Sequence, residues 1–176
     1  MKGRLVVAVV AVLAVCAVAI VAAARQTSIG RTEMEAADSA AAASDWIDAV
    51  FHARAAAEAV APGSPWPERG RARLDAIGRE AEERGDESTA LLAYGALRAA
   101  ALATRLPGWS SSAWRLKADE GIARVAAVHS DRSTPAFEAT RDALRGNEPP
   151  PALHVALLSA GALCAMIGLV FLLLSR

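Results

Sequence analysis

Cysteine is scarce in this sequence. The two cysteines, Cys16 and Cys164, fall inside long apolar runs near the two ends of the 176-residue chain, so the middle region has none. A disulfide or a thiolate metal site needs cysteines in the domain that it holds together. Neither a disulfide nor a thiolate metal site can therefore stabilise the middle region.

Aromatic residues are also few. They make up 5% of the chain, although hydrophobic residues reach 54% and the mean hydropathy is +0.28. Alanine and valine supply much of that apolarity, and small side chains bury little area each, at about 25 cal/mol per Å² of apolar surface. Stability should therefore depend on the few large side chains. We expect four of them to anchor the core: Trp46, Phe51, Tyr94 and Trp114.

The common catalytic signatures are missing. The sequence contains no H-E-x-x-H zinc motif, no C-x-x-C-H haem motif, no glycine-rich phosphate loop and no G-x-S-x-G nucleophile turn. These absences favour a protein that is not an enzyme and that needs no metal or cofactor.

One polar cluster keeps a catalytic alternative open. Asp45, Asp48 and His52 follow an i, i+3, i+7 spacing, which would place two carboxylates and an imidazole on one helical face, as a metal site or an acid/base pair requires. That face is rotated away from the apolar one, so we expect it to point to solvent. His154, at the mouth of the C-terminal apolar run, is a further candidate. The alternative function is thus a membrane-bound enzyme or proton-handling subunit.

The charges are balanced overall but unevenly distributed. All 19 acidic residues lie between Glu33 and Glu148, whereas five of the 19 basic residues lie outside that range, so the middle region has a net charge of −5. Binding to nucleic acid depends on Lys and Arg that neutralise phosphates. Nucleic acid is therefore excluded as a partner.

The first apolar run is long enough to cross a bilayer. Leu5 to Ala24 is 20 uncharged residues, which at about 1.5 Å per residue span a hydrocarbon core of about 30 Å. We expect residues 1–24 to form an N-terminal transmembrane helix or signal anchor. A cleaved signal is the alternative, because Ala22-Ala23-Ala24 suits a cleavage site.

The second apolar run covers 152–174, within a predicted C-terminal transmembrane helix at 151–175. Gly161, Ala165 and Gly168 form a stripe of small residues, which would let another helix approach closely. The partner would be the first span or a second copy of the chain, and chance occurrence of small residues is the alternative.

Lys2 and Arg4 precede the first run and favour an N-terminus on the inside, although Arg25 and Arg31 on the other flank make the difference small. We therefore expect a bacterial inner-membrane protein whose middle domain is periplasmic or extracellular.

The middle region, 32–148, is predicted to be a bundle of about five helices. A capping box at Thr32 and Glu35 begins the first helix, after Gly30 interrupts the segment that follows the first span. The prolines from Pro62 onward end this helix near Ala61. The others are expected at about 68–84, 86–106, 110–129 and 134–146. No stretch alternates apolar and polar residues as a strand would. The fold class is all-α, with two terminal transmembrane helices flanking the bundle.

The second and third of these helices form a predicted hairpin, because Gly85 suits a C-cap and Asp86 an N-cap. The patterns Leu74-x2-Ile77-Gly78 and Ala90-x3-Tyr94-x2-Leu97 resemble one tetratricopeptide repeat of about 34 residues. The family often has tryptophan at the position of Leu74, an aromatic residue at Ala81 and a closing proline near Leu102. An ordinary antiparallel helix pair is the alternative.

The resemblance implies a hairpin that presents a surface to a peptide or protein, with Tyr94 and Leu97 as predicted contact residues. The sequence thus predicts an integral membrane protein whose helical extracytoplasmic domain acts as scaffold, accessory subunit or protein-binding module.

Overall fold

The computed structural model describes residues 2–104, 111–129 and 134–146. These residues form six α-helices and contain no β-strand, so the predicted all-α class is confirmed for this part of the chain. The chain divides into two compact units. Residues of α1 up to Ala22 belong to one unit, and the described residues from Ala23 onward belong to the other, which is the helical bundle.

Helix α1 (Lys2–Ala42) contains the first apolar run and continues well beyond it. Large side chains of the run are exposed, with Val15 and Val18 each at 70%. Of the described helices, α1 alone is long and apolar enough to cross a bilayer, and a signal sequence near the N-terminus would share these properties. The second predicted span, 152–174, lies outside the described residues.

The predicted helix start at Thr32 is wrong, because α1 runs through Gly30 and Thr32 without interruption. Gly30 is a packing residue and not a break. A Cβ at this position would lie 2.7 Å from the Cβ of Trp66, so the missing side chain is what allows the two segments to approach.

The single helix expected up to Ala61 is two helices, α1 and α2 (Trp46–Glu58). Ser44 adopts a positive φ of 60° between them. The Asp45 carboxylate then caps α2, accepting the backbone N–H of Asp48 at 3.2 Å. An aspartate that can satisfy an unpaired N–H of a helix start competes with helix continuation, which explains the break.

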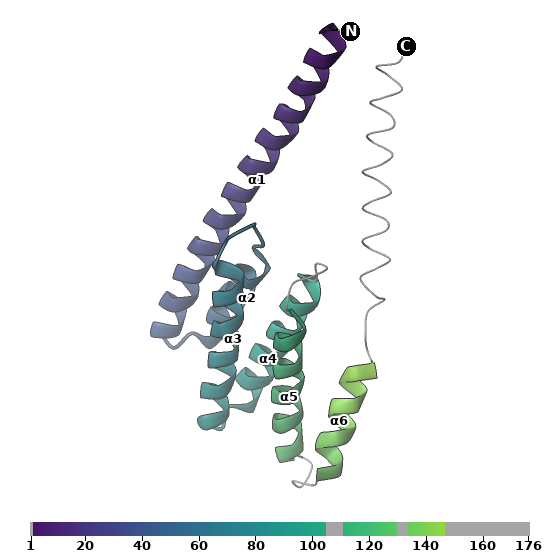
Figure 1. The fold of residues 1–176 in the computed structure, drawn as a ribbon. Helices are drawn as coiled ribbons and strands as arrows, with labels where there is room; N and C mark the ends of the chain where they lie inside the picture. The colour runs from purple at the N-terminus through teal and green to yellow at the C-terminus, as the bar shows by residue number, and fades with distance from the viewer. Residues whose placement is uncertain (1, 105–110, 130–133, 147–176) are drawn as a thin grey trace. The chain divides into compact units, whose positions relative to one another are not determined.

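The predicted hairpin is confirmed as α3 (Trp66–Glu83) and α4 (Glu87–Ala103), which lie side by side (Figure 1). Gly85 has a φ of 72° in the turn, a conformation that favours glycine. The Asp86 carboxylate accepts the N–H of Thr89 at 3.1 Å, and hydrogen bonds from Thr89 and Ser88 lower the pKa of Asp86 to about 2. Whether the hairpin is a tetratricopeptide-type unit stays a prediction.

Two further helices, α5 (Ser111–His129) and α6 (Thr134–Gly146), complete the described part. Helix α5 packs against α4, and α6 packs against α5 (Figure 1). Both agree with the predicted ranges to within one residue at each end.

The core of the bundle is made mostly of alanine, as expected, with a few large residues between them. Leu74, Ile77, Tyr94 and Leu97 are the largest fully buried apolar side chains among the described residues. The prediction for Phe51 is wrong, because its side chain is 67% exposed on the outer face of α2. Trp46 and Trp114 are partly buried at the edge of the core, and only Tyr94 of the four anchors lies at its centre.

Helices α2 and α3 cross at Gly70, where the backbones are in contact. A Cβ at Gly70 would lie 2.5 Å from the backbone nitrogen of Ala57 and 2.7 Å from the carbonyl oxygen of Ala53. Backbone atoms cannot rotate away as side chains do. We therefore expect Gly70→Ala to lower the free energy of unfolding by about 1–3 kcal/mol, measured by urea unfolding of the full chain in detergent.

Gly95 provides the matched control for this substitution. It is also helical but exposed, and a Cβ there would meet nothing within 4 Å. Gly95→Ala should stabilise the protein by up to about 1 kcal/mol through helix propensity alone. Equal stabilisation by both substitutions would contradict the close crossing at Gly70.

Candidate functional site

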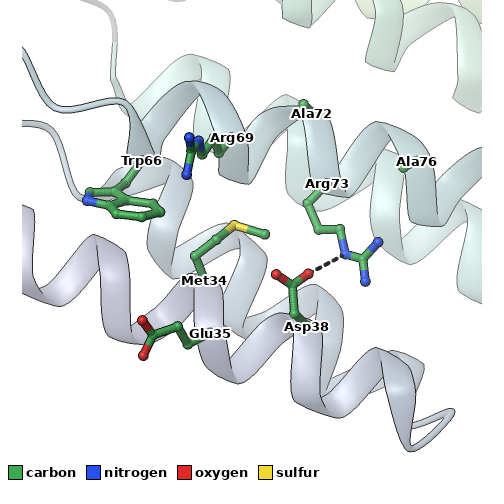
Figure 2. A pocket seen from close by; sticks show the side chains of 8 residues that line it. All are labelled: Met34, Glu35, Asp38, Trp66, Arg69, Ala72, Arg73 and Ala76. Carbon is green, nitrogen blue, oxygen red and sulfur yellow. Dashed lines mark ion pairs between the residues drawn. The ribbon is translucent and has the colours of Figure 1, made fainter.

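An open groove runs between the second half of α1 and one side of α3 (Figure 2). It has a volume of about 520 Å³. Its lining residues recur every three or four positions along each helix, which places them on one face. They are Met34, Glu35 and Asp38 from α1, and Trp66, Arg69, Ala72, Arg73 and Ala76 from α3.

The groove combines an apolar centre with charged edges. Met34 is 9% exposed and lies against the core, and Trp66 closes one end. The ion pair between Arg73 Nε and Asp38 Oδ1, at 3.2 Å, bridges the two helices (Figure 2). Arg69 stacks its guanidinium 4.9 Å from the centre of the Trp66 ring.

Arg69 is the exposed cation of the groove that lacks a carboxylate partner within the described residues. By contrast, the acidic residues of the groove are occupied: Asp38 binds Arg73, and Glu35 binds Arg31 at 2.8 Å. The groove therefore offers one unpaired positive charge next to an aromatic ring and a methionine.

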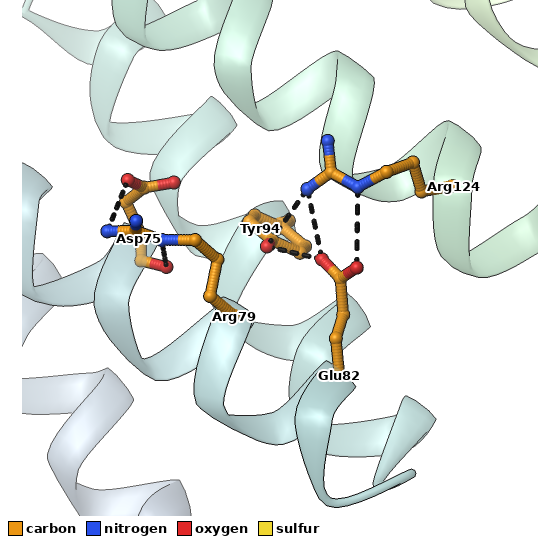
Figure 3. A network of polar contacts seen from close by, with 5 residues as sticks. All are labelled: Asp75, Arg79, Glu82, Tyr94 and Arg124. Atoms are coloured by element: carbon orange, nitrogen blue, oxygen red, sulfur yellow. Dashed lines mark hydrogen bonds and ion pairs between the residues drawn. The ribbon is translucent and has the colours of Figure 1, made fainter.

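Tyr94 holds three helices together at the centre of the bundle. Its ring from α4 lies between Gly78 of α3 and Gly121 of α5; a Cβ at either glycine would come within 2.7 Å of ring atoms. The Tyr94 hydroxyl donates to Glu82 Oε1, and Arg124 donates to Glu82 from α5 at 3.1 and 3.3 Å (Figure 3). Burial and the hydrogen bond to Glu82 raise the pKa of Tyr94.

Tyr94 and Leu97, the predicted partner-contact residues, are both fully buried. Their side chains serve the core, so a partner of the hairpin would touch other residues of α3 and α4. The physical reason is that a large apolar residue at the centre of an alanine-rich core fills volume that no neighbour can fill. The i, i+4 pair of the exposed Arg79 and the partly buried Asp75 is also drawn in Figure 3, with an N–O distance of 3.1 Å.

A second polar cluster links α3, α4 and α5 at the end of the bundle where α1 joins. Arg71, 7% exposed, donates to Thr104 Oγ1 at 2.8 Å and pairs with Glu68 at 3.3 Å. Glu68 also accepts the indole N–H of Trp114 at 2.9 Å. Arg71 therefore belongs to the interior of the bundle.

A third cluster fixes α6. Arg98 of α4 pairs with Asp119 of α5 at 2.8 Å, and Asp119 is 2% exposed. The same guanidinium donates to the carbonyl oxygen of Leu144 in α6 at 3.2 Å. Near its C-terminus a helix has carbonyls without intrahelical partners, so a cation is favoured there.

The structure does not bring Asp45, Asp48 and His52 together as a site. Asp45 caps α2, Asp48 is exposed, and His52 Nδ1 lies 2.8 Å from Glu33 Oε2 of α1. No three His, Cys, Asp or Glu side chains within the described residues are placed to hold a metal ion. The metal interpretation of these three residues is therefore wrong, because Asp45 precedes the helix. The catalytic alternative stays a prediction.

The other predicted site residues fall in the part of the chain outside the described ranges. These are the helix-association stripe of Gly161, Ala165 and Gly168, and His154.

Comparison with protein-family models, curated proteins and solved structures finds no match to this chain. Function is therefore inferred from the apolar helix, the groove and the polar contacts around them.

Sequence reasoning missed the groove. Trp66, Arg69, Arg73 and Ala76 share one side of α3, and that spacing could have marked a face with an aromatic residue and two cations. The opposing residues of α1 could not be assigned, because the helix was expected to start at Thr32 and nothing in the sequence aligns it with α3.

Proposed function

We propose that this chain is an integral membrane protein whose helical domain acts outside the cytoplasm as a scaffold, accessory subunit or protein-binding module. The observation that carries the proposal is the groove between α1 and α3, which is open and unfilled by the described residues. The exposed apolar half of α1 supports a bilayer anchor, because such a surface is costly in water.

The groove suits a helical or extended segment of another protein better than a small molecule. Small-molecule pockets enclose most of their ligand, whereas this groove is open along two helices. Apolar side chains of an amphipathic helix lie in such grooves as a row of anchors. Met34 supports this occupant, since methionine adapts its shape to different apolar partners.

The charges of the groove define the chemistry of the partner further. A carboxylate on the partner would reach Arg69 as the apolar side chain beside it contacts Trp66 and Met34. Arginine and tryptophan are the residue types most enriched where few residues dominate binding. We therefore propose a partner segment that carries an aspartate or glutamate next to large apolar residues.

The proposed location is the bacterial inner membrane with the bundle on the periplasmic or outer side, from the basic residues Lys2 and Arg4 before the apolar run. Self-association through the small residues Gly161, Ala165 and Gly168 belongs to the same proposal. The hairpin of α3 and α4 would present one wall of the groove in the way that helical-repeat units present a surface.

A photo-crosslinking residue at Ala72 in the groove tests the proposal in native membranes. We expect Ala72, which is exposed, to capture one defined protein reproducibly. The charge reversal Arg69→Glu should reduce the captured amount about tenfold, as a loss of about 1.4 kcal/mol would.

Two controls match these substitutions. Ala139, an exposed alanine of α6, carries the same crosslinker away from the groove, and Arg79→Glu reverses an exposed charge of α3 that does not line it. The same crosslinked protein from Ala139, or equal losses from both charge reversals, would argue against the groove as the binding site.

A further inference from the structure

Two tryptophans with cations stacked on them lie at the end of the bundle where α1 joins it. Arg69 lies over the Trp66 ring at 4.9 Å, and Lys117 lies over the Trp114 ring at 4.4 Å. Helix α3 begins at Trp66 and α5 at Ser111, so both pairs lie within the first two turns of their helices. We call these four residues the Trp66–Trp114 surface.

Contacts within the bundle place the members of this surface near one another and near α1. Glu68, two residues after Trp66, accepts the indole N–H of Trp114 at 2.9 Å, which connects the two tryptophans. Gly30 of α1 contacts Trp66 directly. The apolar run ends at Ala24, six residues before Gly30, a length of about 9 Å along a helix.

The surface carries two positive charges that no carboxylate within the described residues neutralises. Glu68 is the acidic residue between the tryptophans, and Arg71 and Trp114 already engage it. Neither Arg69 nor Lys117 has a carboxylate partner within the described residues. Figure 2 shows the indole nitrogen of Trp66 on the side of the ring away from Met34, so the polar edge of the ring points out of the groove.

Tryptophan rings with a polar edge and long basic side chains are the residues that concentrate at the headgroup level of membranes. From this geometry we infer that the Trp66–Trp114 surface contacts the headgroup and glycerol region of the bilayer. The inference rests on the proposed function in one respect, that α1 anchors the chain in lipid. It adds that the bundle itself touches the membrane, with Lys117 directed to lipid phosphates.

The chain contains its own matched control for this inference. Trp46 is also partly buried under a stacked cation, with Arg84 4.1 Å from its ring centre, but Arg84 is the C-cap of α3. Arg84 follows Trp66 by 18 residues, or about 27 Å of helix. Stacking on a cation is therefore common to both ends of α3, so it does not by itself distinguish the Trp66–Trp114 surface.

Tryptophan quenching by brominated lipid tests the inference in the full chain. Single-tryptophan variants keep Trp46, Trp66 or Trp114, with the other tryptophans replaced by phenylalanine, and are reconstituted in phosphatidylethanolamine–phosphatidylglycerol vesicles whose acyl chains carry bromine near the carbonyl group. We expect Trp66 and Trp114 to lose about half of their emission, as residues at the membrane interface would, and Trp46 to keep nearly all of it.

A reporter tryptophan placed in the apolar run tests the proposed membrane anchor separately from this inference. The Val21→Trp variant, with the native tryptophans replaced, places a tryptophan at an exposed position near the end of the apolar run of α1, close to the depth of the brominated carbons. If that reporter is quenched and Trp66 and Trp114 are not, the inference is overturned and the anchor stands. If the reporter is not quenched either, the anchor fails and the inference fails with it.

Dyes on single exposed cysteines test the inference without replacing any tryptophan, so the result does not depend on how the tryptophan variants fold. Lys117→Cys and Glu83→Cys alter exposed positions toward opposite ends of the bundle, and serine replaces Cys16 and Cys164 in both variants so that a single thiol remains. A polarity-sensitive dye should shift its emission to the blue in vesicles at position 117 and not at position 83. Identical spectra at both positions would overturn the inference.

Discussion

Replacing Tyr94 with alanine is expected to lower the free energy of unfolding by about 3–5 kcal/mol. The ring is fully buried and fills the space between Gly78 of α3 and Gly121 of α5. Its removal leaves a cavity among side chains that are mostly alanine and cannot expand to fill it. Urea unfolding of the full chain in detergent, followed by circular dichroism at one wavelength, measures the change.

A double-mutant cycle shows whether the ring and the glycine act as a pair. Gly121→Ala alone should destabilise the protein, since its Cβ would lie 2.6 Å from three atoms of the Tyr94 ring. The same substitution in the Tyr94→Ala background should be close to neutral or stabilising, because the ring is gone. Strictly additive effects would contradict the insertion of the ring between α3 and α5.

Alkaline pH gives the hydroxyl of Tyr94 a separate readout. Burial, followed by the hydrogen bond to Glu82, raises the pKa of Tyr94 in the folded state. The unfolded chain therefore releases the proton first, so the stability from this group is complete below pH ~10 and declines as the pH rises toward the folded pKa. Tyr94→Phe should flatten this decline, and an unchanged slope would rule out Tyr94 as its source.

Replacing Asp119 with alanine is expected to lower the free energy of unfolding by an amount comparable to that of Tyr94→Ala. Asp119→Ala leaves the Arg98 guanidinium, whose side chain is 18% exposed, without its partner. Breaking a buried pair on one side typically costs about 3–5 kcal/mol, because an uncompensated charge remains inside. The second carboxylate oxygen of Asp119 has no hydrogen-bond partner within the described residues, so we expect the lower end of that range.

The effect of Asp119→Ala should reach α6 as well. Arg98 also donates to Leu144, so a guanidinium that turns toward solvent releases the end of α6. Hydrogen exchange should show faster exchange of α6 amides than of α3 amides in the variant. Glu80→Ala is the control, because it removes an exposed i, i+4 pair with Arg84 and should cost at most about 0.5 kcal/mol. Equal losses in the two variants would contradict a buried role for Asp119.

Local rules were sufficient for several helices. Gly85 and Asp86 mark the turn between α3 and α4, because a positive φ favours glycine and a helix start favours aspartate, and both effects act within a few residues. The prolines at 62, 65 and 67 likewise place the start of α3.

Local rules failed at the junction of α1 and α2. The alanines around residue 42 favour a helix wherever they stand, so the sequence shows no sign of an end there. Asp45 fitted a helical face as well as a cap, and only its observed hydrogen bond to the Asp48 backbone distinguishes the two. Gly30 was misread for a similar reason, since a glycine that ends a helix and one that admits a neighbour look alike in sequence.

The candidate site depended on information that no local pattern contains. Phe51 was expected inside and is exposed, whereas Tyr94 and Leu97 were expected to contact a partner and are buried. Periodicity indicates which residues share a face, but not which face meets another helix when alanine lines most of the helix.

By itself, the sequence determined the helical class, the apolar character of α1 and the turns, because these follow from propensity, capping and side-chain transfer energies that act within single segments. Only the tertiary structure decided which side of α3 meets α1. It also decided that Tyr94 lies between two glycines and that Arg69 faces an open groove. Those results depend on how closely particular backbones can approach, which is a property of pairs of helices and not of either one.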